Sequence, residues 1–280
     1  MTPGQDIRDL IFRSTRNKKY VAHISAQGEG ILSGTDWLKE ACQRLGISLR
    51  RCKKNGSKVK PSEIIAVLEG QAKQMALAEE ELIGWISKAS GIATAGRRAR
   101  RAAGKTLKVV SGAWKKMPFP IKDLDRQAIT DGGIHFRVAE KPFLYLDKNY
   151  VRILGGVKRA LVAVNSLEGF VRVIQLKGEG GRLLQEAVLA AEGGADIIMI
   201  DTGRREDIEE VDRSLRQQGL RKRVKIAFGG NIRIEDLKEL RKMPVEIVDI
   251  GQVIVDAPLL DMRMDIIRRV QVEDPWSSNS

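Results

Sequence analysis

The sequence predicts an α/β protein of two parts, an N-terminal α/β sandwich domain followed by an incomplete β/α barrel. Short apolar runs alternate with amphipathic segments after Gly104, which is typical of buried parallel strands joined by helices. Before Gly104, strand-like runs surround glycine-rich turns and one long helical pattern. We therefore expect a first domain over residues 1–104, joined by the C-terminal segment 265–280, and a barrel over residues 105–264.

The first part contains a small set of strands and two helices. A helix is expected to begin at Thr35 or Asp36 and to end at Gly46. A second helix is expected from Ala72 to Ser90, where Gly91 interrupts the pattern. The expected strands are Tyr20 to Ile24, Ile47 to Lys53 and Ile64 to Glu69.

The second part shows repeated strand and helix patterns. The expected strands are Leu107 to Val110, Leu161 to Val164, Val171 to Leu176, Ile197 to Ile200, Val224 to Ala227 and Ile247 to Ile250. The expected helices are Arg182 to Glu192, Glu206 to Gln217 and Ile234 to Arg241. In a barrel of this type, the residues that follow the strands carry the chemistry.

The charge balance favours an anionic ligand. Lys and Arg number 49 against 36 Asp and Glu, which gives a net charge of +13. Aromatic residues make up 5% and do not alternate with the basic clusters, so small phosphorylated ligands are favoured over nucleic acid. No run approaches the roughly 20 apolar residues of a membrane span. Because the two cysteines suggest neither a metal site nor a disulfide framework, a reduced, cytoplasmic location is expected.

Polar and glycine residues follow four successive strands of the expected barrel. They are Gln175 with Lys177, then Asp201, then Gly229-Gly230, then Gly251. Paired glycines let the backbone approach a ligand, and free N–H groups bind phosphate oxygens. Asp201 is suited to ribose hydroxyls or Mg²⁺. The plainer alternatives are a tight turn at the glycines and a helix cap at Asp201.

These motifs resemble the quinolinate phosphoribosyltransferase family, also called nicotinate-nucleotide pyrophosphorylase (carboxylating). The most specific run is Ser90-Gly91-Ile92-Ala93-Thr94, and Gly30-Ile31-Leu32-Ser33-Gly34 also fits the first domain. In the barrel, the run from Gly193 to Asp201, then Gly229-Gly230-Asn231-Ile232, then Ile250-Gly251 follow the family's order. The resemblance extends from about Asp6 to Arg268.

The resemblance implies a fold, a reaction and an assembly. The fold is an N-terminal α/β sandwich with an incomplete seven-stranded barrel. The reaction transfers phosphoribose from phosphoribosyl pyrophosphate to quinolinate with Mg²⁺, and it yields nicotinate mononucleotide, CO₂ and pyrophosphate for NAD biosynthesis. The assembly is a head-to-tail homodimer in which each subunit helps to close its neighbour's active site.

Several family positions carry different residues in this sequence. Trp114 stands in place of an arginine, while the following lysine is kept as Lys115. Phe136 replaces a histidine, and the next arginine is kept as Arg137. Loss of an arginine removes a bidentate clamp for a carboxylate, and tryptophan adds a flat apolar face.

Other departures lie further along the chain. Asp147 stands in place of a family lysine, with Lys148 beside it, and Glu80 replaces a helix arginine. Gln175 falls near an acidic family position, whereas Asp201 is kept. The phosphate and ribose side is therefore better preserved than the side that binds the acid.

The expected site combines transfer, binding and metal residues. Three explanations remain open: quinolinate or a close analogue as acceptor, another aromatic acceptor, or a non-catalytic phosphosugar-binding or regulatory role. The transfer residues are Lys115, Arg137 and Asp201, with Asp201 also holding Mg²⁺; the binding residues are Trp114, Lys116, Lys148, Gln175, Lys177, Gly229, Gly230 and Gly251.

Overall fold

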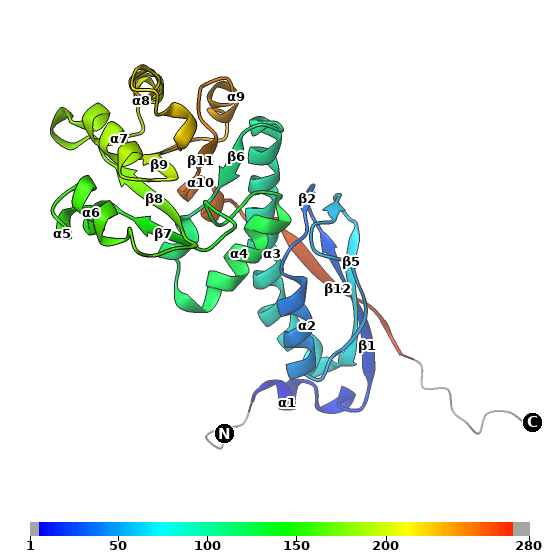
Figure 1. Ribbon diagram of the computed structural model, residues 1–280. Helices are drawn as coiled ribbons and strands as arrows, with labels where there is room; N and C mark the ends of the chain where they lie inside the picture. Colours follow the sequence, from blue (N-terminus) through cyan, green and yellow to red (C-terminus); the bar gives the residue numbers. More distant parts are fainter. Residues whose placement is uncertain (1–5, 271–280) are drawn as a thin grey trace, which may run out of the picture. The chain divides into compact units, whose positions relative to one another are not determined.

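The computed structural model describes residues 6–270, which form two compact units. The first unit contains the chain up to Thr94 and from Pro258 onward, and the second is Ala95–Ala257. From the sequence, the boundaries between the two parts were expected after residues 104 and 264. The difference arises because the long helix α3 (Ala72–Ala103) contributes residues to both units (Figure 1). Part of the expected returning segment, residues 271–280, lies outside the described residues.

The first unit is built on an antiparallel sheet. Its strand order is β12-β1-β5-β3, so the late strand β12 pairs with β1. The short strands β2 and β4 form a separate antiparallel pair. The bounds are β1 (Lys19–Ala26), β2 (Gly30–Ile31), β3 (Ser48–Cys52), β4 (Lys58–Val59), β5 (Ile64–Gln71) and β12 (Met262–Arg269).

Helix α2 (Thr35–Arg44) and the first part of α3 share an apolar core with this sheet (Figure 1). Leu38 of α2, Leu82 of α3 and Leu68 of β5 are all buried in it. Each such leucine stabilises the fold by about 1.5–3 kcal/mol relative to an exposed position. The sandwich expected from the sequence is therefore present.

The expectation that Gly91 interrupts a helix is wrong. Helix α3 continues through Gly91 to Ala103. A Cβ at position 91 would lie 2.1 Å from the backbone oxygen of Pro258, which is far inside contact distance. Glycine is present here because another part of the backbone lies against the helix, a requirement that the local pattern does not reveal.

The most specific sequence run, residues 90–94, secures the end of β2 and the loop that follows it. The Ile31 N–H donates to Thr94 Oγ1 at 2.9 Å, and the Ser33 N–H donates to Ser90 Oγ at 3.0 Å. Both hydroxyls therefore satisfy buried backbone groups that lie outside the sheet ladders. In this unit, the motif acts in packing.

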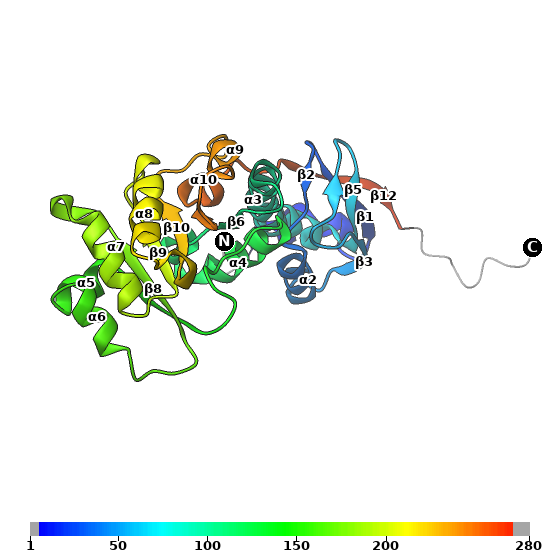
Figure 2. The same ribbon diagram turned by 45° about the horizontal axis from the view of Figure 1, so that its top comes forward.

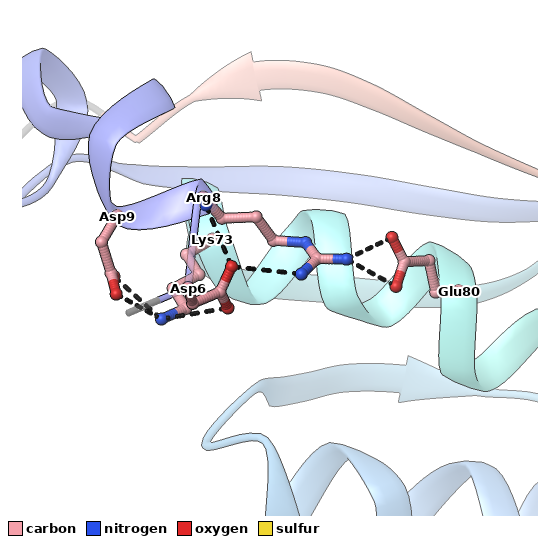
Figure 3. Close-up of polar contacts among 5 residues, drawn as sticks. All are labelled: Asp6, Arg8, Asp9, Lys73 and Glu80. Atoms are coloured by element: carbon pink, nitrogen blue, oxygen red, sulfur yellow. Dashed lines mark hydrogen bonds and ion pairs between the residues drawn. The ribbon is translucent and has the colours of Figure 1, made fainter. Parts of the chain in front are cut away.

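Charged residues join the N-terminal helix α1 (Arg8–Ile11) and its preceding residue Asp6 to α3 (Figure 3). Arg8 donates to both carboxylate oxygens of Glu80 at 2.5 and 2.7 Å. Lys73 pairs with Asp9 at 2.8 Å and with Asp6 at 3.3 Å. Glu80, the residue that replaces a family arginine, thus has a local partner. These pairs are largely exposed, so each contributes at most about 1 kcal/mol.

The second unit is a curled parallel sheet. Its strand order is β6-β11-β10-β9-β8-β7, and all these pairs are parallel. Among the described residues this sheet has six strands, and His135 adds only an isolated parallel bridge to Val110 beside β6. The bounds are β6 (Lys108–Val110), β7 (Phe143–Leu146), β8 (Val171–Leu176), β9 (Ile197–Ile200), β10 (Lys225–Gly229) and β11 (Ile247–Asp249).

Helices cover this sheet on its outer side. Helix α7 packs against β8 and β9, and α8 packs against β10 (Figure 2). The helices expected at Arg182 to Glu192 and Glu206 to Gln217 are confirmed as α7 and α8. The bounds are α4 (Lys122–Asp131), α5 (Lys148–Ile153), α6 (Val157–Ala163), α7 (Leu183–Glu192), α8 (Glu206–Gln217), α9 (Leu237–Leu240) and α10 (Gln252–Val255).

Two expectations for this unit need correction. The strand expected at Leu161 to Val164 is wrong, because most of this run lies in α6. Leu161 and Val164 are buried while Val162 is exposed, a three-residue spacing that is helical. The helix expected over Ile234 to Arg241 is shortened to α9. The strand β7 was not expected from the sequence.

Arg221 secures the end of α8 through two ion pairs, a largely buried one with Asp212 and a partly exposed one with Glu246. Its Nε donates to Asp212 Oδ1 at 2.6 Å, and its Nη2 donates to Glu246 Oε1 at 2.6 Å. Its Nη1 also donates to the carbonyl oxygen of Val224 at 2.9 Å. The side chain of Arg221 is only 13% exposed. Removing it would leave Asp212 facing a desolvated space.

We expect Arg221→Ala to lower the free energy of unfolding by about 2–3 kcal/mol at neutral pH, measured by urea denaturation. Burial raises the pKa of Asp212, but hydrogen bonds from Arg216 and Arg221 outweigh it, so the pKa lies below its ordinary value of 3.8. The pairing therefore stabilises the fold above pH 3.8 and is lost below it. A difference between variant and wild type that stays constant below pH 3.8 would contradict the pairing.

Candidate active site

A cleft of about 1580 Å³ lies at the carboxyl ends of the strands in the second unit. It is lined by the loops after β6, β8, β9, β10 and β11. All but one of the residues expected in the site line this cleft, and the exception is Lys148. Those that line it are Trp114, Lys115, Lys116, Arg137, Gln175, Lys177, Asp201, Gly229, Gly230 and Gly251. The barrel thus brings together residues that are far apart in the sequence.

The Gly229-Gly230 turn is packed tightly against the loop after β9. The Gly203 N–H donates to the Gly229 carbonyl at 3.1 Å. Gly230 has a φ of +107°, and a Cβ there would lie 2.7 Å from the nitrogen of Gly203. Close packing between two loops is therefore one reason for this glycine, in addition to any approach by a ligand.

The same turn presents unpaired backbone donors. Among residues 6–270, no protein group accepts a hydrogen bond from the N–H of Gly230, Asn231 or Ile232. All three residues line the cleft, and Asn231 has a left-handed φ of +52°. Successive N–H groups in such a conformation form a concave site for an anion. We call residues Gly229 to Ile232 the anion cradle.

Asp201 follows β9 at the centre of a small polar network. Its Oδ2 accepts from Lys177 Nζ at 2.6 Å and from Gln175 Nε2 at 2.6 Å. Lys177 also donates to the Asp201 carbonyl at 3.0 Å. Both contacts use Oδ2, and no described residue donates a hydrogen bond to Oδ1. Asp201 is therefore held in place with one oxygen available.

Lys148, which was expected to bind the ligand, lies outside the described cleft lining, whereas the neighbouring Asp147 lies within it. The backbone N–H of Lys148 donates to Gln175 Oε1 at 2.9 Å, and its side chain is exposed. Asp147 caps α5 by accepting from the N–H groups of Asn149 at 2.7 Å and Tyr150 at 3.1 Å. The capping role explains why an aspartate suits this position.

Asp249, at the end of β11, was missed in the sequence analysis. Its Oδ1 accepts the N–H of Gly112 at 2.9 Å. Burial raises the pKa of Asp249, and the charge of Asp201 also raises it, against the lowering effects of Gly112, Lys115 and Lys116. The available signal was a single acidic residue inside the apolar run before Gly251, at the end of a strand.

Aromatic side chains form one wall of the cleft. Trp114 and Phe136 contact edge to face, with ring centroids 6.1 Å apart. The Trp114 Nε1–H donates to the Phe136 carbonyl at 2.9 Å, which fixes the indole. Phe143 and Tyr145 also line the cleft. We call Trp114, Phe136, Phe143 and Tyr145 the aromatic wall.

Cationic side chains lie over three of these rings. Arg126 lies 4.5 Å from the Trp114 ring centroid, Lys115 lies 5.0 Å from that of Tyr145, and Arg137 lies 5.2 Å from that of Phe143. Such contacts stabilise a cation by about 0.5–2 kcal/mol. The wall therefore holds positive charge at its surface, where it can meet an anionic aromatic molecule.

Tyr145 and His135 differ in their relation to the site. Burial raises the pKa of Tyr145, and the charges of Asp249, Asp201 and Asp147 raise it further, so its phenol stays a hydrogen-bond donor. His135 does not line the described cleft. Burial lowers the pKa of His135, and its backbone bridges to Val110.

The fold and the site together define a class of protein. A parallel barrel that carries an anion cradle, a carboxylate and an aromatic wall at its strand ends is built to hold a phosphorylated small molecule beside an aromatic one. Among the described residues, no helix is long and apolar enough to cross a membrane.

The chain belongs to the quinolinate phosphoribosyl transferase family. Sequence models of the family's N-terminal and C-terminal domains match residues 9–90 and 92–265. A probable nicotinate-nucleotide pyrophosphorylase (carboxylating) of Archaeoglobus fulgidus is 30% identical over 254 residues, which is 90% of this chain and 96% of that protein. The human nicotinate-nucleotide pyrophosphorylase (carboxylating) is 26% identical, over 89% of this chain and 82% of that protein.

Solved structures show the same fold. NadC from Streptococcus pyogenes superposes with a TM-score of 0.81 at 19% identity, over 96% of this chain and 92% of that one. Nicotinate-nucleotide pyrophosphorylase from Pyrococcus furiosus gives a TM-score of 0.79 at 25% identity, over 95% of this chain and 75% of that one. The sandwich and incomplete barrel expected from the sequence are thereby confirmed.

Proposed function

We propose that this protein is a phosphoribosyltransferase that transfers phosphoribose from phosphoribosyl pyrophosphate to quinolinate or a related heteroaromatic acceptor. The observation that carries the proposal is one cleft that holds the anion cradle, Asp201 and the paired cations Lys115 and Lys116. With quinolinate as acceptor, the products are nicotinate mononucleotide, CO₂ and pyrophosphate, in NAD biosynthesis. The names of the relatives support this reaction.

Each group of residues has a defined task in this reaction. The N–H groups of the anion cradle, together with Gly251, bind the 5′-phosphate. Lys115 and Lys116 meet the pyrophosphate and stabilise the charge that develops as it leaves. A pyridine acceptor already has a nitrogen lone pair, so the protein would mainly orient the two reactants. Lys177 and Gln175 hold the Asp201 carboxylate in position.

The donors in the cleft fit Mg²⁺ bound together with its substrate. Among residues 6–270, no three acidic, histidine or cysteine side chains lie close enough to form a metal site. Mg²⁺ commonly uses one or two carboxylates and completes its coordination with substrate oxygens and water. Asp201, with Oδ1 available, is the residue that would hold it. Mg²⁺ would supply charge neutralisation at the pyrophosphate.

The acceptor side favours an aromatic molecule with less negative charge than the family acceptor. Trp114 is fixed by its hydrogen bond to Phe136 and occupies the position of a family arginine. Arg137 remains in the cleft, where it is positioned over Phe143 to meet one carboxylate. A different aromatic acid is therefore a second candidate acceptor. Phosphosugar binding without transfer remains the non-catalytic alternative.

We further propose that the protein acts in the cytoplasm as a homodimer with a shared active site. The family relationship supports this assembly. The dimer is tested by sedimentation analysis together with mixing of two inactive variants, one in each unit. Restored activity in the mixture supports a shared site, and a monomer contradicts it.

The transfer activity is tested by incubating the protein with phosphoribosyl pyrophosphate, Mg²⁺ and quinolinate. Release of pyrophosphate with formation of nicotinate mononucleotide supports the quinolinate version. If pyrophosphate forms only with other heteroaromatic acids, the second acceptor class is correct. Thermal stabilisation by phosphoribosyl pyrophosphate without consumption of any acid would favour the non-catalytic alternative.

We expect Gly230→Ala to abolish most of the thermal stabilisation by phosphoribosyl pyrophosphate. The added Cβ would press on the nitrogen of Gly203 and displace the cradle. Gly219→Ala is the matched control, because Gly219 also has a positive φ of +68° but a Cβ there meets nothing within 4 Å. Equal ligand-induced shifts in both variants, measured by differential scanning fluorimetry, would argue against the cradle.

A further inference from the structure

We infer that Lys177 makes metal binding at Asp201 depend on the substrate. Its ammonium pairs with the carboxylate and weakens the hold of Asp201 on a free divalent metal, and it gives its remaining N–H to the pyrophosphate of phosphoribosyl pyrophosphate. The inference rests on the phosphoribosyl transfer proposed above and assigns a specific task to one lysine of that site. Four features of the described cleft lead to it.

The first feature is a double contact between Lys177 and Asp201. The Lys177 Nζ lies 2.6 Å from Asp201 Oδ2 and donates to the Asp201 carbonyl at 3.0 Å. The Asp201 N–H donates in return to the carbonyl of Leu176 at 2.9 Å. Because Leu176 ends β8 and Ile200 ends the neighbouring strand β9, the pairing of the two strands places the ammonium beside the carboxylate.

The second feature is the residue that shares Asp201 with Lys177. Gln175, which falls near an acidic position of the family, donates from Nε2 to the same Oδ2 at 2.6 Å. Its Oε1 accepts the Lys148 N–H at 2.9 Å, so this oxygen already has a partner. An amide donor thus lies where a carboxylate would strengthen a metal site. Asp201 is left as a carboxylate whose charge is already paired, and Mg²⁺, which gives up its water reluctantly, is held weakly by such a ligand.

The third feature is the hydrogen-bonding capacity that remains in this pair. A lysine ammonium has three N–H donors, and within residues 6–270 the two acceptors of Lys177 both belong to Asp201. One donor is left, and Lys177 lines the cleft with a side chain that is 33% exposed. A Cβ at Gly229 would lie 3.5 Å from Asp201 Oδ1, so this oxygen faces the anion cradle. The pair therefore offers both a donor and an oxygen to a ligand in the cleft.

The fourth feature is the charge around the pair. The described lining of the cleft contains six lysines and arginines and four aspartates. A free dication therefore meets a region of net positive charge, whereas a polyphosphate is attracted to it. The oxygens of the bound pyrophosphate then supply the ligands and the negative charge that Asp201 lacks while it is paired with Lys177. Lys177 thus ties the metal affinity of Asp201 to the presence of the substrate.

The test measures metal binding by the full-length protein without substrate. Mn²⁺ prefers the same oxygen ligands as Mg²⁺ and is followed by electron paramagnetic resonance. Lys177→Met keeps most of the length of the side chain and removes its charge. We expect this variant to bind Mn²⁺ at least about tenfold more tightly than wild type, because Oδ2 is released from its ion pair. An affinity for Mn²⁺ that is unchanged or lower in the variant would overturn the inference.

The second measurement is the affinity for phosphoribosyl pyrophosphate in EDTA, obtained by isothermal titration calorimetry. We expect Lys177→Met to lose about tenfold, since the contact between the ammonium and the pyrophosphate is removed. A residue that only supports the fold would lower the affinities for metal and substrate together, whereas Lys177 should change them in opposite directions. Unchanged binding of phosphoribosyl pyrophosphate would contradict the contact. Lys158→Met removes an exposed lysine from α6 and should leave both affinities as in wild type.

A double variant identifies the carboxylate that gains the metal. Lys177→Met combined with Asp201→Asn should lose the added affinity for Mn²⁺, because the released carboxylate charge is absent. If the gain persists in the double variant, the metal is held elsewhere in the cleft, and the inference is overturned. Circular dichroism of each variant confirms that the fold is retained before the affinities are compared.

The outcomes separate this inference from the proposed function. If phosphoribosyl pyrophosphate binds neither wild type nor Lys177→Met, in Mg²⁺ or in EDTA, phosphoribosyl transfer itself is wrong. If it binds both proteins, and the two proteins have equal affinities for Mn²⁺, only the role of Lys177 is wrong.

Discussion

Gly91→Ala is expected to lower the free energy of unfolding by about 3 kcal/mol or more. The new methyl group would lie 2.1 Å from the backbone oxygen of Pro258 and 3.2 Å from the Cα of Leu259. Both are backbone atoms, so no side-chain rotation can relieve the overlap. Either α3 or the chain that leads into β12 must move, and the core of the first unit opens. Urea denaturation followed by circular dichroism measures the loss.

Gly84→Ala is the matched control for this prediction. Gly84 lies on an exposed position of the same helix, and a Cβ there meets nothing within 4 Å. Alanine is preferred over glycine inside a helix by about 1 kcal/mol, so this variant should be slightly more stable than wild type. Opposite signs for the two variants support the backbone contact. Similar changes in the free energy of unfolding at both positions would mean that the chain at Pro258, which leads into β12, does not lie against α3.

Asp201→Asn is expected to weaken the binding of phosphoribosyl pyrophosphate in Mg²⁺ by about a hundredfold. The substitution keeps the shape of the side chain and an acceptor for Gln175, but it removes the charge that would hold Mg²⁺. A contact to a charged group is worth about 1.5–3 kcal/mol, which corresponds to roughly ten- to 150-fold in affinity. Isothermal titration calorimetry in Mg²⁺ and in EDTA measures the effect.

The dependence on Mg²⁺ distinguishes a metal ligand from a structural residue. The wild type should bind phosphoribosyl pyrophosphate more tightly in Mg²⁺ than in EDTA, and the variant should show little difference. Glu210→Gln removes a carboxylate from the exposed face of α8 and should leave both affinities unchanged. A variant that retains the full response to Mg²⁺ would exclude Asp201 as the metal residue.

The apolar spacing and the glycines were sufficient to predict both parts of the fold. Buried strands such as Ile197 to Ile200 and amphipathic helices such as α8 have local patterns, because each face of an element is set by neighbouring residues. The expected phosphate turn at Gly229-Gly230 and the carboxylate at Asp201 also lie together in the described cleft. Residues at strand ends share this edge in any parallel barrel.

Other features depended on contacts between distant parts of the chain. Gly91 is explained by Pro258, and the indole of Trp114 is fixed by the carbonyl of Phe136. The side chain of Lys148 is exposed, since only its backbone N–H contacts Gln175. No spacing along the chain contains these relations. They arise when separate elements pack together.

The sequence by itself determined the class of fold, the family and the phosphate side of the cleft. The tertiary structure decided the character of the other side of the cleft. There Asp249, on β11, accepts a hydrogen bond from the N–H of Gly112, which lies 137 positions earlier in the sequence. Local periodicity records which face of an element is buried, but it does not record which side chains from different strands meet. A carboxylate acquires its role from the donors and charges around it, and these are assembled only when the barrel closes.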